Sequence, residues 1–64
     1  MEVPVRVDLP SGRTLITSWE VVEIPGGGYN TFGDGAIGSV SEEELDQLLG
    51  EGLEVAGKKY SLVV

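Results

Sequence analysis

The sequence contains no cysteine and no histidine. Disulfide bonds and structural zinc sites, the usual means of stabilising a very small domain, are therefore excluded. Nucleophilic catalysis by a Ser–His or Cys–His pair is excluded for the same reason. The carboxylates do not follow the spacing of an EF-hand loop. We therefore expect no metal ion, no cofactor and no enzymatic activity.

Basic residues are also scarce. The sequence has four basic and eleven acidic residues, which gives a formal net charge of −7. None of the four lies between residues 14 and 57, where nine acidic residues are found. Such a chain repels the phosphate backbone, so direct binding to nucleic acid is not expected. The acidic surface either keeps the protein in solution or competes for a basic groove on a partner. The four cations are Arg6, Arg13, Lys58 and Lys59.

No apolar run is long enough to span a membrane, and the start of the chain lacks the basic and then apolar pattern of a signal peptide. We therefore expect a soluble, cytoplasmic protein without a membrane partner. With 64 residues, the chain (1–64) has room for a single domain. A domain of about 60 residues buries only about 60% of its unfolded surface. Since no disulfide can compensate, the sequence predicts a homo-oligomer.

The N-terminal part of the chain predicts a β-hairpin. Apolar and polar residues alternate strictly from Glu2 to Leu9, as in a strand with one buried face. Pro4 has no amide hydrogen, which predicts that this strand lies at an edge of the sheet or begins there. The segment Pro10–Gly12 predicts a three-residue turn in which Gly12 adopts a positive φ.

A second strand is predicted over residues 14–24, and the turn length sets its register. The like-charged pair Glu2 and Glu20 is expected to end the pairing. Further along, Val21 and Val22 interrupt the alternation, which predicts a bulge or a partner subunit that covers both faces. Trp19 is expected in the core. The pairs predicted from this register include Val7 with Leu15, Val5 with Thr17, and Val3 with Trp19.

A short strand over residues 36–40 and then a helix are predicted next. Ser41 and Glu44 have the spacing of a capping box, and Val40 with Leu45 would form a hydrophobic staple. Glutamates 42–44 suit the positive end of the helix dipole. The helix is expected to end at Gly50 in a left-handed cap, with one apolar stripe. That stripe consists of Leu45, Leu48 and Leu49.

The C-terminal residues predict a second hairpin, with strands over 53–55 and 60–64 and a turn over 56–59. Its inward residues would be Leu53, Val55, Tyr60, Leu62 and Val64. Val63 would face outward on a terminal strand and invite pairing with another chain. The predicted fold class is α+β: a small antiparallel sheet of two hairpins with one short helix, in the order β-β-(β)-α-β-β.

The segment from Pro25 to Gly38 contains six glycines and two of the four aromatic residues. Residues 33–40 match the spacing GxGxxGxV of phosphate-binding loops. A dinucleotide site needs a strand directly before the motif and a helix that starts within it, and a kinase needs a much longer chain. We therefore attribute the match to glycine content.

Backbone amides of a glycine-rich loop can nevertheless approach an anion closely. The aromatic rings of the segment could stack on a planar ligand, while its polar side chains read the ligand's edges and basic residues supply charge. The alternative is a long connection whose rings pack against the core. The candidate ligand-binding residues are Tyr29, Asn30, Thr31, Phe32, Asp34, Arg6 and Arg13.

Two functions follow, both of them non-enzymatic. The first is an oligomeric sequestrant of a small, nucleotide-like ligand, for example a phage-type inhibitor of host defence signalling. The second is an acidic inhibitor or adaptor, whose helix and glycine segment occupy a basic, nucleic-acid-binding surface of a partner protein. A structural subunit of a larger assembly is a third alternative.

Overall fold

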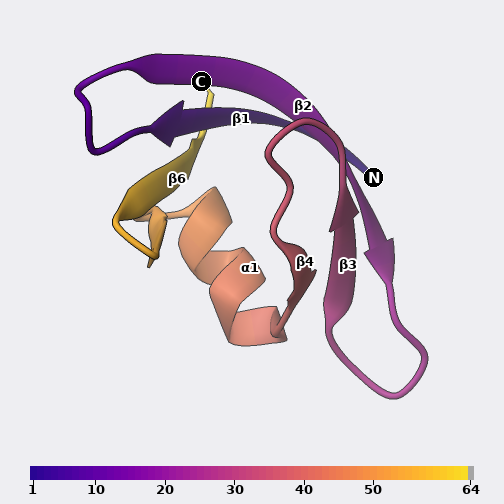
Figure 1. The fold of residues 1–64 in the computed structure, drawn as a ribbon. Coiled ribbons are helices and arrows are strands. Elements are labelled where there is room, and N and C mark those ends of the chain that lie inside the picture. The colour runs from indigo at the N-terminus through magenta and orange to yellow at the C-terminus, as the bar shows by residue number, and fades with distance from the viewer. Residues whose placement is uncertain (64) are drawn as a thin grey trace.

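The computed structural model describes residues 1–63, which form one antiparallel sheet and one helix. The six strands follow the order β4-β3-β2-β1-β6-β5, and the sheet curves around the helix as a half-barrel (Figure 1). The fold is therefore of the predicted α+β type. The elements are β1 (Glu2–Asp8), β2 (Thr14–Glu23), β3 (Tyr29–Phe32), β4 (Gly38–Val40), α1 (Glu42–Leu49), β5 (Leu53–Val55) and β6 (Lys58–Leu62).

The predicted order of elements is wrong in one respect, because the glycine segment contains a strand. β3 pairs with β2 from Glu23↔Tyr29 to Glu20↔Phe32 and with β4 on its other side. Aromatic residues and threonine favour this extended conformation, and the glycines before β3 form a turn with positive φ. The strand predicted over residues 36–40 is shortened to β4.

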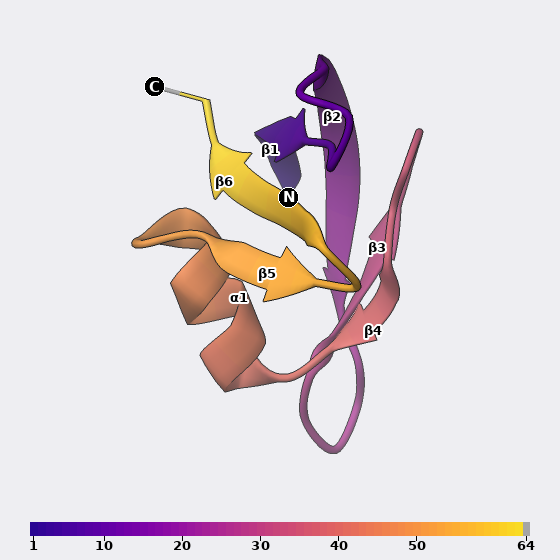
Figure 2. The same ribbon diagram turned by 60° about the vertical axis from the view of Figure 1, so that its left-hand side comes forward.

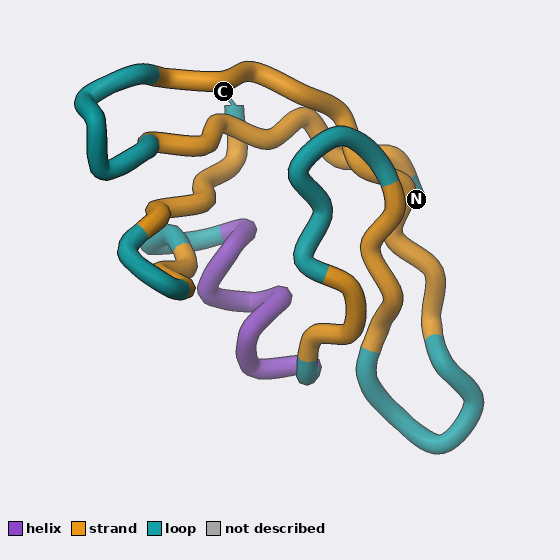
Figure 3. Tube along the Cα trace, in the orientation of Figure 1, coloured by secondary structure: helices purple, strands orange, loops and turns teal. Residues whose placement is uncertain are grey.

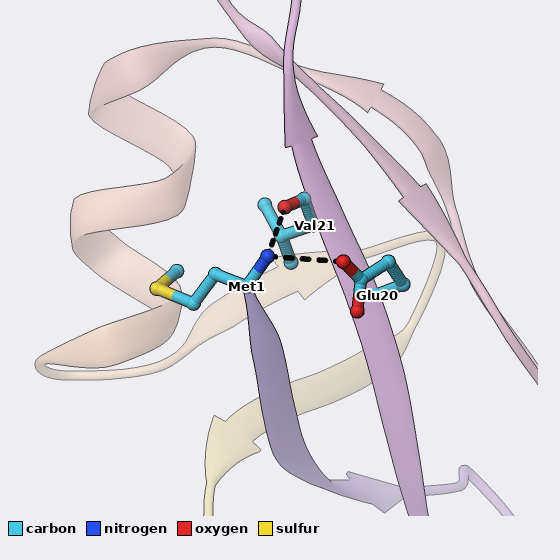
Figure 4. A network of polar contacts seen from close by, with 3 residues as sticks. All are labelled: Met1, Glu20 and Val21. Carbon is cyan, nitrogen blue, oxygen red and sulfur yellow. Dashed lines mark hydrogen bonds and ion pairs between the residues drawn. The ribbon is translucent and has the colours of Figure 1, made fainter.

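The register of the first hairpin is confirmed. All predicted pairs are present, and Gly12 closes the turn with a φ of 90°. The expectation that pairing stops before Glu2 and Glu20 is wrong, because these residues still pair. The ammonium group of Met1 lies 3.1 Å from Glu20 Oε1 and 2.9 Å from the carbonyl oxygen of Val21 (Figure 4). This cation neutralises the Glu20 carboxylate and so offsets its repulsion with Glu2.

β1 is not an edge strand over its whole length, since β6 pairs with it on the side opposite β2. The other alternative, that the strand only begins at an edge, agrees with the structure, because this pairing starts at Val5 and leaves the first residues of β1 without a paired strand on that side. The Pro4 carbonyl accepts a hydrogen bond of 3.0 Å from the Val63 amide, just beyond the last β1–β6 pair, Val5↔Leu62. The missing amide of Pro4 therefore falls where this ladder ends. Val63, which was predicted to lie outward on a terminal strand and to pair with another chain, instead donates its amide to β1 of the same chain. The edges of the sheet are the three-residue strands β4 and β5.

The core fills the space between the inner face of the sheet and α1, which packs against β5 and β6 (Figure 2). Trp19 and Leu48 are fully buried, which confirms Trp19 as a core residue. The Trp19 and Tyr60 rings lie 5.5 Å apart between centroids. The buried apolar residues are Val3, Val5, Val7, Trp19, Val21, Val40, Leu45, Leu48, Leu53 and Tyr60.

The predicted bulge in β2 is absent from the structure. The pairing of β2 with β3 is continuous, so Trp19 and Val21 point inward and Val22 points outward. Val22 is 46% exposed, and within the chain described here no second layer covers it.

The helix begins as predicted and ends differently. Glu44 N donates to Ser41 Oγ at 3.1 Å, and Ser41 N donates to Glu44 Oε1 at 2.8 Å, which confirms the capping box. Gly50 ends the helix with a φ of −109°, so the predicted left-handed cap is wrong. The positive φ occurs at Gly52 instead, whose amide donates to the carbonyl of Gln47. The apolar stripe is narrower than predicted, because Leu49 is 37% exposed.

The second hairpin is present, and β5 has the predicted bounds. β6 runs over Lys58–Leu62 and not over the predicted residues 60–64, so the turn is shorter. Val55↔Lys58 is its last pair, which leaves a two-residue turn. Ala56 and Gly57 both have positive φ, at 51° and 81°, as a type I′ turn requires. Val64, predicted to point inward, lies outside the described residues. Within residues 1–63, the single helix is too short and too polar to cross a membrane.

Candidate partner-binding groove

A groove of about 740 Å³ lies between the β2–β3 turn and the start of α1. Figure 3 shows the two segments that border it, the turn in teal and the first helical turn in purple. β3 and β4 lie between these two segments along the chain. The groove is open to solvent, and it is lined by Ile24, Gly27, Gly28, Ser39, Val40, Ser41, Glu42, Glu43 and Glu44.

The glycines of the β2–β3 turn determine the shape of this groove. The Gly27 amide donates to the Ile24 carbonyl at 3.0 Å, and the Ile24 amide donates to the Gly28 carbonyl at 2.9 Å. A Cβ on Gly28 would lie 3.0 Å from the carbonyl oxygen of Val40. Gly28 also has a φ of 80°, so both the conformation and the close approach to β4 require glycine.

The electrostatic character of the groove comes from three consecutive glutamates at the helix start. Glu42 and Glu43 are exposed, while Glu44 is half-buried and its carboxylate accepts from the Ser41 amide. Three carboxylates already complement the positive end of the helix dipole. None of the lining residues is basic. The groove therefore disfavours phosphate and other anions and suits an ammonium or guanidinium group.

Two of the predicted ligand-binding residues join β3 to β4. Thr31 is 4% exposed; its Oγ1 donates to the Gly38 carbonyl at 2.9 Å and accepts from the Ile37 amide at 3.1 Å. Asn30 Oδ1 accepts from Ser39 Oγ at 2.8 Å on the outer face. The Thr31 hydroxyl is thus engaged inside the protein and is not presented to a ligand.

The two aromatic candidates lie on opposite faces of the sheet. Tyr29 packs against the core, whereas Phe32 is 54% exposed on the outer face. Asp34 lies in the connection between β3 and β4, where its backbone carbonyl accepts from Trp19 Nε1. The rings of one chain therefore cannot enclose the same ligand.

The two basic candidates lie away from the groove. Arg6 is on the outer face of β1, where its Nε donates to Asp8 Oδ1 at 3.1 Å. This hydrogen bond, together with one from the Thr14 hydroxyl, holds the pKa of Asp8 below its ordinary value, and nearby Lys59 adds to the effect. Arg13 follows the first hairpin turn, at the opposite end of β2 from the groove.

None of the seven predicted ligand-binding residues lines the groove. The sequence nevertheless contained a signal for it, because the run Glu42–Glu44 begins four residues after the last glycine of the glycine segment, Gly38. The second functional hypothesis assigned these two regions to one surface. The β2–β3 turn and the start of α1 come together only because β3 and β4 pair between them. This pairing was not predicted from the sequence, because the high glycine content of the segment obscured the pattern of β3.

Two further observations limit what this region can do. Within residues 1–63, no three acidic side chains come close enough together to hold a metal ion. The glycine motif at residues 33–40 connects two antiparallel strands and does not run from a strand into a helix, unlike a dinucleotide-binding loop.

Comparisons with protein-family models, curated proteins and solved structures found no match. The function must therefore be argued from the chemistry of the surfaces themselves.

Proposed function

We propose that this protein is a non-enzymatic inhibitor or adaptor that binds a basic surface of a partner protein through the groove at the start of α1. The observation that carries the proposal is the composition of the groove. Its lining includes the apolar residues Ile24 and Val40 and the exposed carboxylates Glu42 and Glu43, and it includes no cation.

This combination matches the side chains of lysine and arginine. Their aliphatic stems pack on apolar surface while the charged head remains at the polar rim. Two exposed carboxylates next to each other also steer a basic partner during encounter, an effect that salt screens. A partner surface that normally contacts nucleic acid presents such side chains in high density.

The sequestration of a nucleotide-like ligand stays a prediction. It receives less support from the geometry, because Tyr29 and Phe32 lie on opposite faces and the groove lacks a cation for phosphate. Native mass spectrometry of protein purified from its own host would detect a ligand retained by the chain.

Binding of a fluorescent hexa-arginine peptide tests the proposal. We expect the variant Glu42→Gln/Glu43→Gln to bind about tenfold more weakly than the wild type. The control Glu51→Gln/Glu54→Gln removes the same charge beyond the end of α1, and we expect a change of about twofold or less. Binding should also weaken steeply between about 50 mM and about 500 mM salt.

Equal losses in the two variants would mean that the peptide responds only to net charge, and the groove would not be its site. Binding that resists salt would contradict an electrostatic mechanism. Both variants leave Glu44 and its capping hydrogen bond in place. Glu42→Gln/Glu43→Gln also removes two charges from the positive end of the helix dipole, so its melting temperature should fall slightly. A cooperative melt of both variants above the temperature of the binding assay serves as the folding control.

A further inference from the structure

Over residues 1–63, the sheet ends in two edge strands that differ in charge. β4 and β5 both have three residues. The central residue of β5 is Glu54, and its cross-strand neighbour on β6 is Lys59. β4 consists of a glycine, a serine and a valine and carries no charge. Charged side chains at an edge discourage pairing with a further strand. β5 is therefore protected against such pairing, whereas β4 is not.

The alternation of hydrogen bonds shows which backbone groups of β4 point away from the sheet. Opposed residues of an antiparallel pair are alternately hydrogen-bonded and not hydrogen-bonded. The Ile24 amide donates to the Gly28 carbonyl, so Asn30, two positions further along, also bonds to β2. The residues on either side of Asn30 bond to β4 instead. Since Ser39 lies opposite Asn30, its amide and carbonyl point away from β3.

Ser39 is also one of the residues that line the groove at the start of α1. Ser39 and Gly38 are both exposed, so solvent reaches the backbone of this edge. Directly opposed residues of neighbouring strands have their side chains on the same face of the sheet. The side chain of a residue that paired with Ser39 would therefore enter the groove, which Glu42 and Glu43 also line.

We propose that the partner presents an extended basic segment, which pairs with β4 as a seventh, antiparallel strand. This inference rests on the function proposed above and specifies how the partner binds. Ser39 exchanges two backbone hydrogen bonds with one basic residue of the segment, and the side chain of that residue enters the acidic groove. Residues two positions away share its face, so basic side chains at alternate positions fit best. Strand addition gains affinity from the main chain and specificity from alternate side chains.

Peptides with methylated backbone amides test the pairing. The probe is a fluorescent six-residue peptide in which arginine and threonine alternate, so that the arginines share one face. N-methylation of the arginine amides removes the donors that point towards β4 and should weaken binding about tenfold. N-methylation of the threonine amides, which point away from β4, should change the affinity about twofold or less. The two modified peptides have the same composition and charge, so electrostatic attraction alone does not separate them.

Two variants test the same contact from the side of the protein. Ser39→Pro removes the outward amide and should weaken binding of the unmodified peptide about tenfold. Ser39→Ala keeps this amide and loses only the hydroxyl that donates to Asn30 Oδ1, so it should bind like the wild type. Hydrogen exchange of the wild-type protein does not depend on the folding of a variant. The Ser39 amide should exchange more slowly once the unmodified peptide is bound.

The outcomes separate this inference from the proposed function. If Glu42→Gln/Glu43→Gln weakens binding while both methylated peptides bind equally and the Ser39 amide stays unprotected, the seventh strand is overturned and the acidic groove remains. If binding needs the Ser39 amide but not the two glutamates, the pairing with β4 stands and the function proposed above fails. A wild-type dimer in sedimentation equilibrium that Ser39→Pro abolishes would show that a second copy occupies the edge, which would overturn the inference.

Discussion

Trp19 Nε1 donates a hydrogen bond of 2.9 Å to the backbone carbonyl oxygen of Asp34. Trp19 is fully buried, so this bond ties the connection between β3 and β4 to the core. Gly33 in the same connection lies so close to β2 that a Cβ there would be 2.7 Å from the Ser18 carbonyl oxygen. This part of the glycine segment therefore belongs to the scaffold.

Replacing Trp19 with phenylalanine removes the donor and leaves the Asp34 carbonyl without this partner. We expect Trp19→Phe to lower the free energy of unfolding by about 1–3 kcal/mol. Trp19 is the sole tryptophan, so urea denaturation should be followed by circular dichroism and not by fluorescence. An unchanged midpoint would show that the hydrogen bond contributes nothing to stability.

Gly33→Ala should be more destabilising than Gly27→Ala. Both glycines have positive φ, at 140° and 124°, so both variants incur backbone strain of about 1–3 kcal/mol. A Cβ at Gly27 meets nothing within 4 Å, whereas at Gly33 it collides with backbone. The overlap should add about 1–3 kcal/mol. Equal melting temperatures for the two variants would contradict the close approach of this connection to β2.

The sequence predicted those features that neighbouring residues determine. The register of the first hairpin follows from the turn Pro10–Gly12, and the helix start follows from the spacing of Ser41 and Glu44. Each depends on residues a few positions apart, so local pattern and structure agree.

Features that depend on the order of the strands were not predicted. Pro4 predicted that β1 lies at an edge or begins there, and could not show which, because the β6 strand that covers Val5–Asp8 comes from the far end of the chain. β3 has only four residues and is flanked by glycines, so its own sequence pattern is too short to identify it. The groove was missed for the same reason, since its two sides meet only after β3 and β4 have paired.

The carboxylate of Asp8 should make a pH-dependent contribution to stability. The hydrogen bonds from Arg6 and Thr14 hold its folded-state pKa below the ordinary value of an aspartate. The stabilisation is therefore present above the ordinary pKa and is lost as the pH falls through the lowered one. Asp8→Asn should melt below the wild type at neutral pH, and the difference should shrink in acid.

A carboxyl titration by NMR measures this pKa directly. In Arg6→Gln, the Asp8 pKa should move upward, because the hydrogen bond that contributes most to lowering it is lost. The Asp8 side chain is 39% exposed, so solvent screens its charge, and the change in melting temperature should be small and should decrease with added salt. An Asp8 pKa that does not respond to Arg6→Gln would contradict the contact.

Tyr29→Ala and Phe32→Ala should separate scaffold from surface in the glycine segment. Tyr29 packs against the core, and its removal should cost about 1–3 kcal/mol, less than a fully buried ring. Phe32 is 54% exposed, and its removal should change stability by about 0.5 kcal/mol or less. Thermal melts of the two variants measure these effects. If Phe32→Ala melts like the wild type, its ring is a surface side chain that the fold does not need. If it instead melts well below the wild type, the outer face contributes to the stability of the fold.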